Sequence, residues 1–185
     1  MSTWEVKDPT LHGTNALLLD NTLCNTVNIG AGTREWKDDT IDASFNTTVS
    51  RSSEQAYLGD YSVKLVCLNV GACKATFSTY GFGTAGEEYE FACKVMLPTR
   101  VPSEPLVLQL MAGNTLGASD LGLSGTMIGQ TQPRGEWLQA PTCKFLANGS
   151  TVYLTWAMYA NDVADYLYVD NFTVRPKKLD WTKDN

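Results

Sequence analysis

Histidine and charged side chains are scarce in this sequence. Its 185 residues include one histidine, His12, and only 18% are Asp, Glu, Lys or Arg. A Ser-His-Asp triad needs a positioned base, and a lone histidine among Gly, Thr and Asn is a poor candidate for one. The formal net charge is −6. This balance, without a basic face, argues against binding to nucleic-acid phosphates and to anionic membrane surfaces.

Metal-binding and targeting motifs are missing as well. The chain has no Cys-x-x-Cys motif and no cluster of Cys and His, which argues against a zinc site. Its five cysteines are an odd number without motif spacing, so a disulfide framework is not expected. Cys67 and Cys73 flank a predicted turn, and geometry decides whether they pair. We expect no signal peptide, synthesis in the cytoplasm and no segment that spans a bilayer.

Helical periodicity is nearly absent, and short runs of alternating apolar and polar residues fill the chain instead. The clearest runs are residues 61–67, 88–97, 106–111, 151–159 and 166–174. Further strands are expected near residues 16–19, 45–49, 74–78 and 137–145, and residues 113–135 are expected to form loops with one or two short strands, such as 126–128. Strands with one apolar face predict an all-β fold, an antiparallel β-sandwich of the jelly-roll type.

The domain organisation expected from this pattern is one sandwich with an arm at each end. The sandwich covers residues 15–176, the N-terminal arm residues 1–14 and the C-terminal tail residues 177–185. Trp4 and Trp181 each stand in a polar arm, and an aromatic residue on an arm often anchors it to a neighbouring subunit. We therefore expect the arms to bind a particle lattice, and a homo-oligomer is a further expectation.

Six short motifs follow one another in a characteristic order. They lie at residues 15–21, Trp36, residues 56–65, 89–91, 135–137 and 166–172. Together they resemble the carbohydrate-binding modules with a galactose-binding-like jelly-roll fold, over about residues 15 to 174. The resemblance implies a structural calcium ion, for which Asp170 matches a ligand position and Asp60 is a second candidate. The acidic residue that this family places after its first strand is missing here. The alternative for Asp170 is a hydrogen bond to the backbone at a strand bulge.

Ligand-binding candidates come from the outward positions of the strands and from the loops. Glu90, Lys94, Gln109, Tyr153 and Tyr159 face outward in their alternating runs, as does Thr155. If their strands are neighbours, they form a polar and aromatic platform for sugar rings. Loop candidates are Trp36 and Tyr57. Packing in the core or at its rim is the favoured interpretation of Trp36 and Trp137, and Trp156 is assigned to the core.

These features favour a non-catalytic, surface-binding structural protein, such as a phage virion decoration or adhesion component. Such a protein would be virion-associated, and free cysteines suit assembly in a reducing cytoplasm. The alternative is a stand-alone glycan-binding module. A glycoside hydrolase is a remote alternative, because it needs two carboxylates across a cleft and the acidic residues here show no such pairing by spacing. We expect no enzyme activity.

Overall fold

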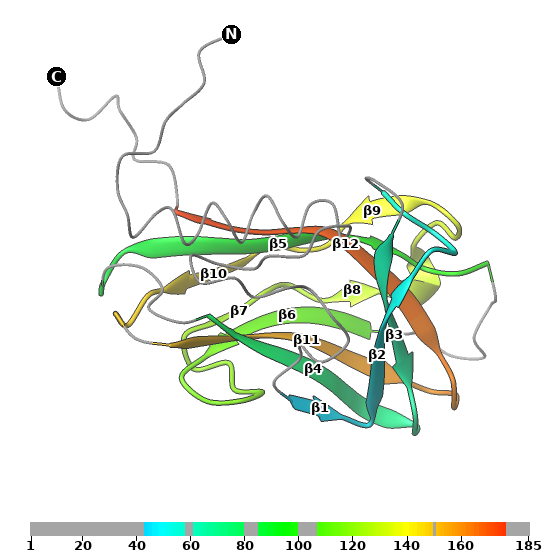
Figure 1. Cartoon of the computed structure of the whole chain (residues 1–185), viewed down its shortest axis with the longest axis horizontal. Helices are drawn as coiled ribbons and strands as arrows, with labels where there is room; N and C mark the ends of the chain where they lie inside the picture. Colours follow the sequence, from blue (N-terminus) through cyan, green and yellow to red (C-terminus); the bar gives the residue numbers. More distant parts are fainter. Residues whose placement is uncertain (1–42, 58–60, 80–84, 100–106, 150, 177–185) are drawn as a thin grey trace, which may run out of the picture.

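The fold consists of two β-sheets that lie face to face (Figure 1). It is seen in a computed structural model that describes residues 43–57, 61–79, 85–99, 107–149 and 151–176. Every strand pair among these residues is antiparallel. The chain is an antiparallel β-sandwich of the jelly-roll type, so the predicted fold class is confirmed.

The sheets have six strands each. Sheet I has the order β1 (Ala43–Phe45), β4 (Gly71–Thr79), β11 (Val152–Ala160), β6 (Val107–Gly113) and β7 (Gly122–Leu123), with β8 (Met127–Ile128) also on β6. Sheet II has the order β10 (Cys143–Leu146), β5 (Glu88–Met96), β12 (Tyr166–Pro176), β3 (Ser62–Cys67) and β2 (Thr47–Ser52), with β9 (Trp137–Gln139) also on β5. A 3₁₀ helix, η2 (Gly129–Thr131), follows β8.

The inward rows of the two sheets form one apolar core. Along β5 and β11 every second side chain is buried, as the alternating sequence predicts. Phe91 of β5 and Trp156 of β11 meet across the two layers, with ring centroids 6.4 Å apart. Both are fully buried, and burial of a large apolar side chain stabilises a fold by about 1.5–3 kcal/mol. The assignment of Trp156 to the core is confirmed.

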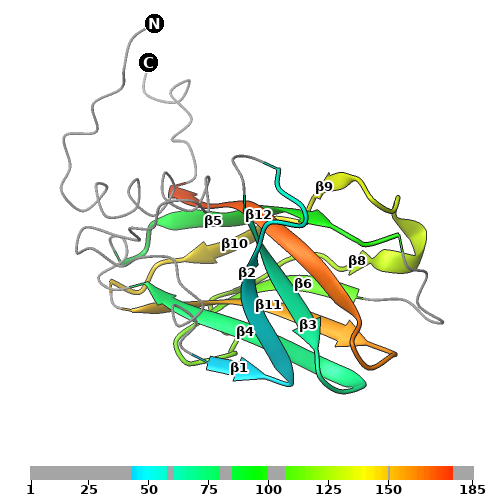
Figure 2. The same cartoon turned by 45° about the vertical axis from the view of Figure 1, so that its right-hand side comes forward.

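The chain crosses between the sheets at Asn46. β1 belongs to sheet I and β2 to sheet II, so the single strand expected near residues 45–49 is in fact two (Figure 2). Asn46 has a φ of 52°, a left-handed conformation that asparagine tolerates. The second crossing, from β3 to β4, lies beside it, because the Leu68 N–H donates to the Asn46 carbonyl and the Asn69 amide donates to Asn46 Oδ1. Hydrogen bonds thus join the two corners.

The strand expected over residues 137–145 is also interrupted. β9 and β10 both pair with β5, but the register shifts by one residue between them, since Gln139 lies opposite Lys94 and Cys143 opposite Phe91. In an unbroken strand, Trp137 would share a face with Cys143. A one-residue shift moves side chains to the other face of a sheet. Cys143 is therefore in the core, whereas Trp137 lies on the outer face and is partly exposed. Of the two placements favoured for Trp137, packing in the core is wrong for this reason.

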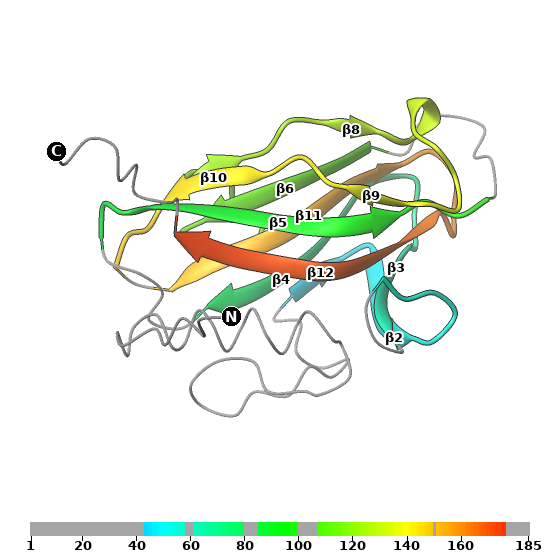
Figure 3. The same ribbon diagram turned by 90° about the horizontal axis from the view of Figure 1, so that it is seen from above.

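The pairing of β12 with β5 also shifts by one residue, at the same position along β5 as the shift between β9 and β10. Asp170 lies opposite Lys94 and Thr173 opposite Ala92, so β12 carries one extra residue there. Asn171, within this bulge, has a φ of 44°. The shift returns Val174 to the core, opposite Phe91. Figure 3 looks onto sheet II and shows β9 and β10 along one side of β5 and β12 along the other.

The loop-rich segment 113–135 contains β7, β8 and η2, and β8 overlaps the predicted strand at 126–128. The expected strand at 16–19 and the arms at 1–14 and 177–185 lie outside the described residues. No helix in the described part of the chain is long and apolar enough to cross a membrane.

The described cysteines are free thiols. Cys67, Cys73, Cys93 and Cys143 are all buried, and Cys67 and Cys73 do not form a disulfide. Burial raises the pKa of the Cys93 thiol and of the Cys143 thiol to about 12 in each case. Burial also raises the pKa of Cys67, and a hydrogen bond with Cys73 adds to that effect. These side chains act as small hydrophobic residues of the core.

Cys93 and Cys143 should resist alkylation by iodoacetamide in the folded protein. Burial keeps these thiols protonated, whereas the thiolate is the reactive form. Burial also blocks access of the reagent. Mass spectrometry of peptides after brief labelling, with and without guanidinium, measures this site by site. Rapid labelling of either residue without denaturant would contradict the buried, protonated state.

Substitution of Trp156 by alanine should destabilise the sandwich by about 3–5 kcal/mol, because it leaves a large cavity between the sheets. Tyr159→Ala is the matched control, since Tyr159 lies on the same strand but is 51% exposed; it should cost well under half as much. Urea denaturation of both variants measures the free energy of unfolding. Equal losses would show that Trp156 does not join the two layers.

Candidate functional site

The predicted sheet-face platform divides between the two sheets. Glu90 and Lys94 lie on β5 in sheet II, whereas Gln109 lies on β6 and Tyr153 and Tyr159 lie on β11 in sheet I. The sheets pack through their inner faces, so the two outer faces point in opposite directions. The five residues therefore cannot form one platform, and each outer face has to be considered separately.

On sheet I the chain covers part of its own outer face. A Cβ at Gly113 would lie 2.6 Å from the Ala118 backbone, so Ala118 packs directly on the end of β6. Lys74 donates from Nζ to the Gly117 carbonyl, 2.9 Å away. Thr155, expected to face water, is fully buried and hydrogen-bonds Thr76 at 2.8 Å. The middle of this face is therefore not available to a ligand.

The predicted residues of sheet I lie around this covered region. Tyr153 is partly buried and lies opposite Gly113. Gln109 is partly buried, and its amide donates to Thr126 Oγ1 at 3.0 Å. Tyr159 is exposed and lies opposite Val107. The three side chains thus do not share one continuous polar surface.

On sheet II two neighbouring rows of side chains cross the outer face. The first row contains Trp137, Met96, Tyr168 and Lys64, which lie opposite one another in register. The second row lies two residues further along the strands, about 7 Å from the first. It contains Gln139, Lys94 and Asp170.

The segment after β2 lies across these two rows and brings Tyr57 to them. The ring of Tyr57 packs edge-on against Trp137, with centroids 5.9 Å apart. The Lys94 ammonium lies 5.2 Å from the centre of the Tyr57 ring. Tyr57 is 40% exposed, and Trp137 and Lys94 are partly exposed. We call Tyr57 and Trp137 the aromatic pair; together with Lys94 they combine aromatic surface with a positive charge.

Asp170 holds the backbone of this segment in place. Its carboxylate accepts the N–H of Tyr57 at 2.7 Å and the N–H of Asn171 at 2.6 Å. Asp170 has no solvent exposure, and hydrogen bonds from backbone donors stabilise such a buried carboxylate. The alternative interpretation of Asp170, a backbone contact at a bulge, is thus what the structure shows.

The calcium ion implied by the family resemblance has little support at Asp170. Both of its oxygens face N–H donors, whereas Ca²⁺ needs six to eight oxygen ligands. No group of three or more His, Cys, Asp or Glu gathers among the described residues. Asp60, the second candidate ligand, lies outside them, as does Trp36.

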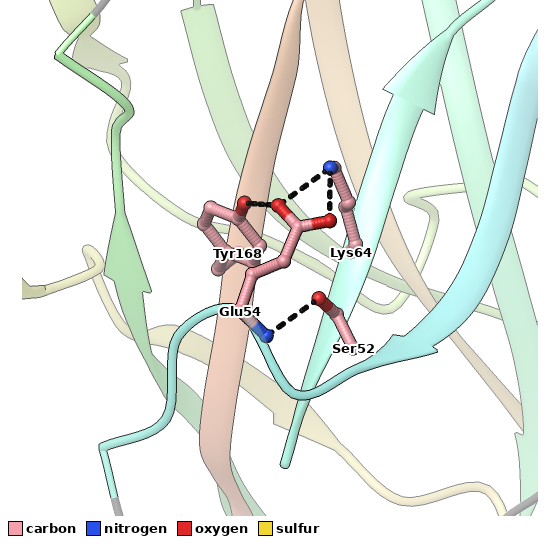
Figure 4. A network of polar contacts seen from close by, with 4 residues as sticks. All are labelled: Ser52, Glu54, Lys64 and Tyr168. Carbon is pink, nitrogen blue, oxygen red and sulfur yellow. Dashed lines mark hydrogen bonds and ion pairs between the residues drawn. The ribbon is translucent and has the colours of Figure 1, made fainter.

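Glu54 forms a second attachment of the same segment (Figure 4). Lys64 Nζ lies 2.9 Å from each of its carboxylate oxygens, and the Tyr168 hydroxyl donates to Glu54 Oε2. The ammonium also lies 4.6 Å from the centre of the Tyr166 ring. The hydrogen bond from Tyr168, followed by the contacts with Lys64, lowers the pKa of Glu54. Desolvation, followed by the hydrogen bond to Glu54, raises the pKa of Tyr168.

The structure therefore brings together two of the predicted ligand-binding residues, Tyr57 and Lys94, with Asp170, the predicted calcium ligand. Glu90 faces the same way but lies four positions further along β5, opposite Lys144. Trp137, Glu54 and Tyr168 also lie in this site, although none of them was among the predicted ligand-binding residues. Tyr168 was visible as an outward position between Leu167 and Val169, but its neighbours depend on strand pairing. Glu54 lies in a loop, where alternation carries no information.

Comparison with known proteins supports the fold. No protein-family model and no curated protein sequence matches the chain. A solved structure described as a carbohydrate-binding module of the β-sandwich superfamily matches with a TM-score of 0.52 and 13% identity, over 72% of this chain and 55% of the other. The fold is that of β-sandwich carbohydrate-binding modules.

Two further structures agree. The CBM22-1 xylan-binding domain of Xyn10C from Paenibacillus barcinonensis gives a TM-score of 0.52 and 18% identity, over 74% of this chain and 86% of that domain. A second xylan-binding domain from CBM22 gives 0.52 and 12% identity, over 72% of this chain and 85% of that one. At these identities the likeness establishes the architecture, while a function has to be argued from the site.

Replacement of Glu54 by glutamine should destabilise the protein in a pH-dependent way. A carboxyl group whose pKa is lowered by folding stabilises the fold above its ordinary pKa, and this contribution is lost as the pH falls through the folded value. The difference between wild type and Glu54→Gln should thus be largest at neutral pH and shrink below pH 4.5, the ordinary value. Urea denaturation across this range measures it. A difference that does not change with pH would exclude the charged contact.

Proposed function

We propose that this chain is a glycan-binding module and that its ligand lies on the outer face of sheet II. The observation that carries the proposal is the partly exposed aromatic pair, Tyr57 and Trp137, beside the Lys94 ammonium. Ligand sites combine apolar surface with a few placed polar groups. An aromatic ring offers a flat apolar surface to the C–H face of a sugar ring, and the Lys94 ammonium offers a polar contact to its substituents.

The hydrogen bonds that hold segment 53–57 on sheet II favour ligand recognition, and not only a structural role, for the aromatic pair. Asp170 holds the backbone of Tyr57, and the ring of Tyr57 contacts Trp137 and the Lys94 ammonium. Glu54 is fixed by Lys64 and Tyr168. A site whose side chains are ordered before binding loses less conformational entropy when the ligand arrives.

The structural neighbours favour this function over the particle-associated role. Two of those described above are xylan-binding domains by their descriptions. Of the features that suggested a virion component, Trp4 and Trp181 in the arms lie outside the described residues, and the free cysteines fit either role. Attachment to a particle lattice, homo-oligomerisation, virion localisation and the lack of enzyme activity remain predictions. A particle protein that also binds glycans would satisfy both proposals.

A glycan array probed with the purified protein tests the proposal directly. We expect saturable binding that weakens at least tenfold in Tyr57→Ala and in Trp137→Ala, because buried aromatic contacts dominate binding energy at such sites. Tyr159→Ala and Tyr153→Ala, on the outer face of sheet I, are the matched controls and should bind as the wild type does. Thermal unfolding of each variant confirms that it is folded.

Two outcomes would contradict the proposal in different ways. Loss of binding in Tyr159→Ala or Tyr153→Ala alone would move the site to sheet I. No binding to any arrayed glycan would remove the glycan-binding function and restore the particle-associated role as the leading hypothesis.

A further inference from the structure

Among the described residues, Lys94 lies at the aromatic pair without an exposed carboxylate beside it to neutralise its charge. In the part of the chain that the structure describes, its ammonium forms no ion pair, and it contacts the ring of Tyr57. Lys64, the other cation of these two rows, is neutralised by Glu54 through two contacts of 2.9 Å. A ligand resting on the aromatic pair therefore meets the charge of Lys94.

Asp170 does not compete for this role. It lies opposite Lys94 in register, but its side chain has no solvent exposure and its oxygens accept the backbone N–H groups of Tyr57 and Asn171. It therefore presents no oxygen to a ligand. The group that reaches the outer surface is the ammonium.

We infer that the site prefers an anionic sugar, one that carries a carboxylate or a sulfate, with Lys94 binding the anionic group while the ring rests on Tyr57 and Trp137. This inference rests on the proposed glycan-binding function and specifies its ligand class. A charge-assisted hydrogen bond is roughly twice as strong as a neutral one. It is stronger still where aromatic rings exclude water from one side of the pair.

Matched polysaccharides test the charge. Polygalacturonate is compared with its carboxyl-reduced form, and dextran sulfate with dextran, by isothermal titration at low and at high salt. We expect the anionic member of at least one pair to bind about tenfold or more tightly, and we expect added salt to reduce that difference, because screening weakens exposed charge pairs. The pair that shows the difference identifies carboxylate or sulfate as the group recognised.

Lys94→Gln should abolish the preference while leaving the protein folded. The matched control is Lys144→Gln, which removes the same charge from the same face of sheet II but opposite Glu90, about 13 Å along the strand from Lys94 at the usual rise per residue. Lys94→Arg should keep the preference. If Lys144→Gln lowers it as much as Lys94→Gln does, the preference is a general charge effect and the inference is wrong.

The remaining outcomes separate this inference from the proposed function. Equal binding of the charged and neutral members, lost in Tyr57→Ala, would overturn the inference and leave glycan binding intact. Binding of neither member of any pair, together with binding of neutral glycans on the array, would do the same. No binding to any glycan would overturn both.

Discussion

The architecture depends on β5, which keeps its alternation without a break while the strands on both sides of it shift register by one residue. The shift from β9 to β10 and the bulge in β12 both occur beside Ala92 and Cys93. A shift of one residue exchanges the two faces of a strand. The two shifts therefore decide, at one level of sheet II, which side chains enter the core and which reach the outer face.

The outer face of sheet II owes its composition to these shifts. Trp137 and Asp170 stand on it beside Lys94 because their strands change register only after passing that level. The Asp170 carboxylate then accepts the backbone N–H of Tyr57, and the Tyr168 hydroxyl donates to the Glu54 carboxylate. Fold stability and the candidate site are thus coupled: the hydrogen bonds that fasten the segment 53–57 to the sheet also present the aromatic pair.

The two outer faces show why a shared fold does not carry a shared function. On sheet I the segment 114–121 packs on Gly113 and on the Lys74 side chain, and Thr155 in the middle of the face is fully buried. On sheet II the shorter segment 53–57 lies against the buried outward residues Tyr168 and Asp170 and adds an exposed aromatic ring. The strands differ little in their alternation, so the difference between the faces comes from the loops that follow them.

The sequence by itself determined the fold class and the inward rows, because burial of one face of a strand imposes a period of two that can be read directly. It also identified Tyr57 and Lys94 as candidates. Only the tertiary structure decided that Glu90 and Lys94 are on a different sheet from Tyr153 and Tyr159, and that Trp137 belongs outside the core. The physical reason is that strand order and register depend on hydrogen bonds between segments far apart in the chain, and alternation within one segment contains no information about its partner.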